Sequence, residues 1–173
     1  MKMKTCAIAA FLLLGAPLAQ ALETTPFVYS TVAEQPQNAN DREIAGLFDR
    51  WNAALKTGSA VAVTSLYAAD AILQPTVSNK VRSTPAQIQD YFVHFLAAKP
   101  VGVINYREIR HLGPDAAMDS GVYTFTLTQT DGSKREVQAR YTFLYERLDG
   151  QWKIINHHSS AMPEVPKTLQ ASH

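Results

Sequence analysis

Three short turn signals divide the C-terminal half of the chain, and they constrain its fold more than any other feature. Gly113-Pro114-Asp115, Thr130-Asp131-Gly132 and Leu148-Asp149-Gly150 separate four stretches rich in β-branched and aromatic residues. The Asp-Gly pairs in the second and third signals favour tight β-hairpins, because both residues tolerate the positive φ of such turns. The sequence therefore predicts an antiparallel meander of four strands, over residues 102–112, 116–130, 134–148 and 151–159.

The chain before the meander has the spacing of helices. Five apolar residues recur three and four positions apart in the first helical stretch: Ile44, Leu47, Phe48, Trp51 and Leu55. This spacing predicts an amphipathic helix that has Asn40 or Asp41 as its cap and ends at Gly58. A shorter helix over residues 60–67 and a brief strand over residues 71–73 are expected to follow.

A further helix begins with a clear start signature. Thr84 can cap it, Pro85 suits its first position, and Gln87 can complete a capping box. Behind these residues lies an apolar stripe made of Ile88, Tyr91, Phe92, Phe95 and Leu96. Helices followed by a meander indicate an α+β fold, in which the helices cover one face of a curved antiparallel sheet.

Aromatic residues alternate along the predicted strands at a period of two: Tyr123, Tyr141, Phe143 and Tyr145. We expect this row on the outer face of the sheet, away from the helices, where it would form a large exposed patch. A second subunit packed against that face would cover it. We therefore predict a homodimer joined sheet to sheet.

The N-terminus is typical of a secretory signal peptide. Lys2 and Lys4 precede a short apolar run, and Ala19-Gln20-Ala21 resembles a cleavage site. We predict a signal peptide over 1–21, an extended leader over 22–40, one domain over 41–166 and a tail over 167–173. The protein should therefore be periplasmic or secreted, and it should have no membrane contact after cleavage.

The cysteine content and the net charge exclude several kinds of site and partner. Cys6 is the only cysteine of the chain and lies within the predicted signal peptide, so we expect no disulfide, no thiol nucleophile and no thiolate metal ligand in the mature protein. The formal net charge of +1 falls to −1 once Lys2 and Lys4 are removed, which does not favour nucleic acid as a partner. We expect neither a cofactor nor a bound metal.

The last two predicted strands resemble a known family. The stretches ARYTFLYER (139–147) and DGQWKIINHHSSAMP (149–163) are similar to the end of the calcium/calmodulin-dependent protein kinase II association domain, with its aspartate-glycine turn, tryptophan and histidine-containing strand. The likeness extends more weakly to Asp41 and to bacterial SnoaL-like proteins. It implies the nuclear transport factor 2-like (cystatin-like) fold, a cone in which a curved sheet wraps around a long helix and leaves a pocket at one end.

The resemblance also implies a ligand site. In the association domain the pocket carries three arginines, and their positions correspond to Phe125, Arg140 and Ser159 in this chain. Since only Arg140 keeps the charge, the expected ligand has one acidic group and an apolar body, and Arg140 should face the pocket to anchor it. Trp51 and Tyr91 should join Phe125 in an aromatic pocket wall.

Two adjacent histidines are the candidate catalytic residues. His157 and His158 lie next to each other on one predicted strand, so their side chains should point to opposite faces and at most one can reach the pocket. Two other candidates, Asp70 and Asp90, are expected to face solvent or to cap a turn. No catalytic triad, paired carboxylate or phosphate loop is present in the sequence.

Three functions stay open on the sequence. The first is binding of a small organic acid or apolar molecule, in a homodimer with Arg140 as anchor. The second is a SnoaL-like enzyme, an isomerase, hydrolase or cofactor-free oxidoreductase, in which His157 or His158 moves a proton. The third is an oligomerisation module without a ligand.

Overall fold

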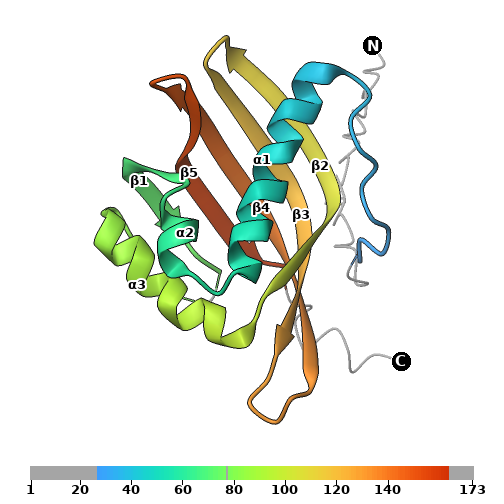
Figure 1. The fold of residues 1–173 in the computed structure, drawn as a ribbon. Helices are drawn as coiled ribbons and strands as arrows, with labels where there is room; N and C mark the ends of the chain where they lie inside the picture. The colour runs from blue at the N-terminus through green and yellow to red at the C-terminus, as the bar shows by residue number, and fades with distance from the viewer. Residues whose placement is uncertain (1–26, 77, 164–173) are drawn as a thin grey trace, which may run out of the picture. The chain divides into compact units, whose positions relative to one another are not determined.

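The structure is a computed structural model that describes residues 27–76 and 78–163. The helices are α1 (Ala39–Lys56), α2 (Ala60–Thr64), α3 (Pro85–Phe95) and the short 3-10 helix η1 (Leu96–Ala98). The strands are β1 (Tyr67–Gln74), β2 (Val101–Gly113), β3 (Ala116–Thr128), β4 (Lys134–Leu148) and β5 (Gln151–Ala161). They form one curved sheet in the order β1-β5-β4-β3-β2, and α1 crosses one face of it (Figure 1). This arrangement confirms the predicted α+β cone.

The first helix starts slightly earlier than the sequence predicts. Its cap is Asn38 rather than Asn40 or Asp41, because the Asn38 side chain is the one that accepts the backbone N–H of Asp41, at 2.8 Å. The helix ends at Lys56, shortly before Gly58, whose φ of +70° is compatible with glycine but strained for other residues. The predicted apolar stripe of α1 is buried against the sheet and α3.

The start signature of α3 is confirmed. The Thr84 hydroxyl accepts the backbone N–H of Gln87 at 3.4 Å, and the Gln87 side chain accepts the backbone N–H of Ser83 at 3.0 Å. Two of the backbone donors at the start of the helix are satisfied in this way.

The first strand is longer than predicted and changes the character of the sheet. β1 covers Tyr67–Gln74 instead of residues 71–73, and α2 ends at Thr64 instead of residue 67. β1 pairs in parallel with β5, at the far end of the domain sequence. The sheet is therefore mixed, with four antiparallel strands and one parallel edge strand, and is not wholly antiparallel as predicted.

The meander agrees with the prediction to within two residues at every strand end. Asp149 and Gly150 have φ angles of 50° and 76° in the turn between β4 and β5, and Gly132 has a φ of 84° in the preceding turn. These positive angles explain why Asp-Gly occurs at both turns.

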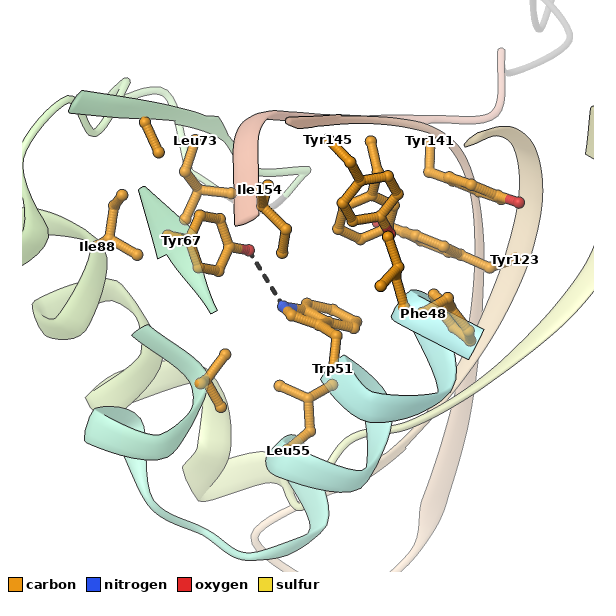
Figure 2. Close-up of a cluster of buried hydrophobic side chains, with 14 of the residues drawn as sticks. Phe48, Trp51, Leu55, Tyr67, Leu73, Ile88, Tyr123, Tyr141, Tyr145 and Ile154 are labelled. Atoms are coloured by element: carbon orange, nitrogen blue, oxygen red, sulfur yellow. Dashed lines mark hydrogen bonds between the residues drawn. The ribbon is translucent and has the colours of Figure 1, made fainter. Parts of the chain in front are cut away.

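The aromatic row of the sheet faces α1, which corrects the prediction that it lies on the outer face. Tyr123, Tyr141, Phe143 and Tyr145 are all at most 3% exposed. Figure 2 shows Tyr123 and Tyr141 on the side of the sheet that faces Phe48 of α1, whose ring stacks with both. Since α1 itself covers these rings, they form core and not a patch for a second subunit, and they no longer support the predicted dimer.

The outer face of the sheet carries a polar surface and part of the N-terminal segment. Gln138 of β4 donates to the carbonyl oxygen of Tyr29 at 2.9 Å, and Asn105 of β2 donates to the carbonyl oxygen of Thr31 at 3.0 Å. Ala33 donates its backbone N–H to Ile104 at 2.9 Å. Residues 29–33 of the predicted leader therefore lie along β2 and reach β4.

Candidate ligand pocket

One small pocket lies between α3, the end of β1 and the inner face of the sheet. Its walls come from six parts of the chain, namely α1, the end of β1, α3, β3, β4 and β5. Most of the lining side chains are aromatic or aliphatic: Trp51, Leu73, Pro75, Thr76, Tyr91, Phe92, Phe95, Tyr123, Phe125, Leu127, Val137, Ala139, His157 and Ser159. The cavity volume is about 40 Å³. Since a water molecule in the liquid occupies about 30 Å³, the side chains nearly fill this pocket.

The structure brings together five of the residues singled out in the sequence. Trp51, Tyr91, Phe125, His157 and Ser159 all line this pocket. They come from α1, α3, β3 and β5, so only the packing of α1 and α3 onto the sheet makes them neighbours.

Arg140 does not belong to the pocket, and the prediction that it faces inward is wrong. It alternates with Tyr141 on β4, and the inner face is taken by the tyrosine because that ring packs against α1. The Arg140 guanidinium is exposed on the outer face, where it donates to the carbonyl oxygen of Ala161 at 3.4 Å. None of the residues lining the pocket is a lysine or an arginine.

The two histidines point to opposite faces, as the sequence predicts. His157 is 4% exposed and lies opposite Phe143 of β4, on whose ring it stacks with centroids 4.0 Å apart. His158 is exposed on the outer face, so it has no access to the pocket. The two aspartates also lie as expected, since Asp70 and Asp90 are exposed.

A chain of hydrogen bonds reaches His157 from the core. The Trp51 indole N–H donates to the Tyr67 hydroxyl oxygen at 3.1 Å (Figure 2). The Tyr67 hydroxyl lies 2.9 Å from Nδ1 of His157. Since the oxygen of Tyr67 already accepts from Trp51, its own proton is satisfied when it is donated to Nδ1.

This chain sets the protonation of His157. When Nδ1 accepts from Tyr67 in a neutral imidazole, the ring proton must lie on Nε2. Burial, with a smaller contribution from the charge of His158, lowers the pKa of His157 to about 3, so the ring is neutral near pH 7. Nε2 is buried and has no hydrogen-bond partner among the residues that the structure describes. His157, which lines the pocket, therefore carries a buried N–H donor without a partner among the described residues.

A second polar group lies at the same wall. Tyr123 donates its hydroxyl to Ser159, and Thr76 is also hydrogen-bonded to Ser159. Burial raises the pKa of Tyr123 to about 12, so its hydroxyl stays protonated. Two hydrogen bonds join these three hydroxyls, which make part of the pocket wall polar but give it no charge.

The outer rim of the pocket is aromatic. Tyr91 and Phe95 of α3 stack with ring centroids 5.6 Å apart, and the guanidinium of Arg82 lies 5.7 Å from the Tyr91 ring. Both rings are only partly buried, unlike Trp51 and Phe92 beneath them. They are the side chains that a molecule entering the pocket would meet first.

Sequence reasoning missed Tyr67 and a separate buried polar cluster beneath α1. In this cluster the Asp119 carboxylate, whose exposure is 0%, accepts from Arg107 Nε at 3.2 Å and from the Tyr141 hydroxyl at 2.8 Å. Burial outweighs the attraction of Arg107 and raises the pKa of Asp119 to about 6. The only signal in the sequence was an aspartate at an inward-facing position of an otherwise apolar strand.

A metal cluster and a membrane-spanning helix are both absent from the described residues. No three or more histidine, cysteine, aspartate or glutamate side chains are grouped so that they could hold a metal ion. No helix in the same part of the chain is long and apolar enough to cross a membrane.

Known structures share this fold. A protein from Xanthomonas campestris, described as a calcium/calmodulin dependent protein kinase II association domain, is 59% identical over 80% of this chain and 99% of its own, with a TM-score of 0.79. The association domain of the Caenorhabditis elegans kinase is 13% identical over 71% of this chain and 95% of its own, with a TM-score of 0.59. A nuclear transport factor 2-like protein with a cystatin-like fold from Novosphingobium aromaticivorans is 15% identical over 75% and 88% of the two chains, with a TM-score of 0.60.

The sequence itself agrees with these structures. No curated protein matches the chain. The family model of the calcium/calmodulin dependent protein kinase II association domain, however, matches residues 40–163, which span α1 to the end of β5. This chain therefore belongs to the calcium/calmodulin-dependent protein kinase II association domain family, and it shares the fold of the nuclear transport factor 2-like structure.

Proposed function

We propose that this domain binds a small, uncharged and largely apolar molecule that carries one hydrogen-bond acceptor, such as a carbonyl oxygen. The observation that carries the proposal is that His157 lines a largely apolar pocket while its buried Nε2–H has no partner among the described residues. An unsatisfied buried donor costs about 1–3 kcal/mol, and a ligand oxygen placed against it would remove that cost. The remaining lining residues offer the ligand body apolar and aromatic contacts.

The same geometry argues against the small acid expected from the sequence. The lining residues include no lysine or arginine, and His157 is neutral because of its burial. A carboxylate in this pocket would lose its hydration without a cation among the lining residues, which is unfavourable. The guanidinium of Arg82 lies at the rim over Tyr91, and it already donates to Ser78 and to the carbonyl oxygen of Lys80. A ketone or an amide pays a smaller desolvation cost and still accepts from Nε2–H.

Entry of such a molecule requires the rim to open. The cavity of about 40 Å³ accepts a group the size of a carbonyl but not the body attached to it. Tyr91 and Phe95 are the partly buried side chains at the mouth, and we propose that they rotate outward when the ligand binds. The stacked pair would then form one wall around the ligand.

The proposal is tested with cyclohexanone as the probe, methylcyclohexane as the probe without an acceptor, and cyclohexanecarboxylate as the charged probe. Binding is followed by changes in the NMR signals of the rim tyrosine and of the His157 ring. His157→Phe removes the donor and keeps a ring, whereas His158→Phe makes the same change on the outer face and is the matched control. We expect cyclohexanone to bind more tightly than either other probe to the parent and to the His158 variant. Because the His157→Phe variant loses one neutral hydrogen bond, its affinity for cyclohexanone should be about 3- to 10-fold lower than that of the parent.

Two results would count against this assignment. One is equal affinity of cyclohexanone for the parent and for the His157→Phe variant, with both variants shown to be folded by circular dichroism. The other is tighter binding of the carboxylate than of the ketone.

The enzymatic alternative receives less support from the geometry. A histidine that moves a proton needs a free ring nitrogen near its substrate. In His157, Nδ1 is engaged with Tyr67 and Nε2 already carries the proton, while His158 lies on the outer face. Neither histidine is therefore arranged as a general base for a molecule in the pocket.

Self-association is the second function that we propose, and the family of the domain favours it. β2 exposes Val101, Val103 and Tyr106, and Tyr106 contacts Tyr29 with ring centroids 5.6 Å apart. Phe27, which packs on Tyr29, is 69% exposed. These apolar residues replace the inward-facing aromatic row as the candidate surface of a homodimer.

Light scattering at micromolar protein concentration tests the homodimer. Val103→Lys should convert a dimer into a monomer, whereas Val93→Lys on α3 places the same charge on an exposed valine elsewhere and should leave the dimer intact. A parent protein that is monomeric, or a dimer that tolerates Val103→Lys, would contradict the proposed surface.

Export is proposed from the sequence alone, because the predicted signal peptide lies outside the described residues. Cleavage after Ala21 would give a mature chain that starts at Leu22. Intact-mass analysis of protein recovered from the periplasm or the medium measures this directly. A mature chain that still starts at Met1 would contradict the proposed export and cleavage.

A further inference from the structure

A second hollow lies on a different part of the domain, between α1 and the turn that joins β4 to β5. Its volume is about 640 Å³, and it shares no lining residue with the ligand pocket described above. Its charged walls are Arg42, Glu43 and Arg50 from α1 and Arg147 and Lys153 from the two strands. We call this hollow the basic groove.

The groove holds more positive than negative charge. Arg147 is paired with Glu43, whose Oε1 accepts from Nη2 at 3.1 Å, and its Nε lies 3.6 Å from Asp115. Arg42 and Lys153 donate to backbone carbonyl groups, and Arg50 has no ion-pair partner within residues 27–76 and 78–163. Three cations of the groove are therefore not neutralised by a carboxylate of the described chain.

The floor of the groove adds a buried donor that lacks a partner. Tyr145 is 1% exposed and lines the groove, and its hydroxyl makes no hydrogen bond to the described residues. Arg147 Nε, in contrast, lies 3.6 Å from the Asp115 carboxylate and is paired with it. A buried donor without a partner costs free energy unless something accepts from it, and anionic oxygens are the strongest acceptors.

One wall of the groove is held rigidly. The guanidinium of Arg147 lies 4.7 Å from the centre of the Trp152 ring, and the Trp152 indole N–H donates to Glu43 at 2.8 Å. Both side chains are thus fixed through the same carboxylate of α1. A fixed arginine loses less conformational entropy when it binds an anion than a free one does.

From these observations we propose that the basic groove binds a small organic polyanion, a molecule with at least two carboxylate or phosphate groups. The three unneutralised cations would pair with its charges, and a shift of the lining side chains on binding would let the buried Tyr145 hydroxyl donate to one of its oxygens. Pockets of about 300–1,000 Å³ accommodate small metabolites, so the groove is large enough for the whole molecule. This site is independent of the neutral-ligand pocket.

Isothermal titration calorimetry at low ionic strength tests the groove, with citrate as the polycarboxylate probe and inorganic phosphate as the phosphate probe. Arg50→Gln and Lys153→Gln each remove one unneutralised cation and should weaken citrate binding about 10-fold, corresponding to about 1.4 kcal/mol. Arg140→Gln is the matched control, because it removes the same charge from the outer face and should change affinity less than about twofold. Tyr145→Phe, which keeps the ring, should weaken binding by a smaller factor.

The outcomes separate the alternatives. Tighter binding of citrate supports a polycarboxylate, and tighter binding of phosphate supports a phosphate ester, provided that the groove variants weaken it and the control does not. Absence of saturable heat with both probes overturns the proposal. The proposal is also overturned if Arg140→Gln weakens citrate binding as much as the groove variants do, since the effect would then come from the overall charge of the protein. His157→Phe should leave citrate binding unchanged, so the two proposed sites succeed or fail separately.

Discussion

The buried carboxyl of Asp119 predicts an unusual dependence of stability on pH. Carboxylates that are ion-paired or hydrogen-bonded in the folded state are usually stabilised in the charged form, and their proteins lose stability as the pH falls. Asp119 should behave in the opposite way, because burial raises its pKa to about 6 although Arg107 lies beside it. The folded protein holds the proton of this group more tightly than the unfolded chain does, so folding is favoured while the group is protonated.

The size of the effect follows from the two pKa values. The unperturbed pKa of an aspartate is about 3.9, and in the folded protein the pKa of Asp119 is about 6. The stability contributed by the proton is fully present below the unfolded value and is lost as the pH rises through the folded value. Between about pH 4.5 and about pH 7, this linkage reduces the free energy of unfolding by about 2 kcal/mol.

The measurement compares the parent with Asp119→Asn, which cannot titrate at this position. Urea unfolding at both pH values gives two free energies of unfolding for each protein, and the difference between the proteins cancels the other titrating groups. The parent should lose about 2 kcal/mol more than the variant on going from the lower to the higher pH. If the parent loses no more than the variant, or gains stability instead, then Arg107 and Tyr141 keep Asp119 ionised and the argument from burial is wrong.

Two further predictions concern the backbone. Gly121→Ala would place a Cβ 2.0 Å from the carbonyl oxygen of Tyr106, so it should lower the free energy of unfolding by at least about 1–3 kcal/mol; Gly46→Ala, with open space around the new Cβ, should not. An unchanged urea midpoint for the Gly121 variant would contradict the close approach of β2 and β3. Thr84→Ala removes the side-chain cap that accepts from Gln87, and thermal unfolding should show a loss of about 1 kcal/mol; a loss near zero would mean that water replaces the cap.

Local signals in the sequence were sufficient for most of the secondary structure. The two Asp-Gly turns place the ends of the last three strands to within two residues, because the conformation of a tight turn depends on the few residues within it. The Thr84 cap predicts the start of α3 for the same reason. Errors arose where pairing was remote, as in β1, whose extension comes from a parallel partner about 85 residues later in the chain.

The alternation of side chains along a strand predicts only part of the candidate site. The period of two correctly separates His157 from His158 and Arg140 from Tyr141. It does not say which member of each pair faces the core, and the resemblance to the association domain led to the wrong face for Arg140. The inner face is decided by α1, since Phe48 packs against Tyr141 and Phe143 and leaves Arg140 outside.

The sequence by itself therefore determined most of the elements, the turns of the meander, the cap of α3 and the fold family, since these depend on neighbouring residues and on a match along the chain. The tertiary structure alone decided which side chains meet. The Tyr67 hydroxyl reaches His157 across 90 residues, and Asp119 meets Arg107 through the pairing of β2 with β3. Such contacts depend on register and on the docking of α1, which many distant residues fix together. The unpartnered Nε2–H of His157 is a consequence of that packing, and no local pattern in the chain encodes it.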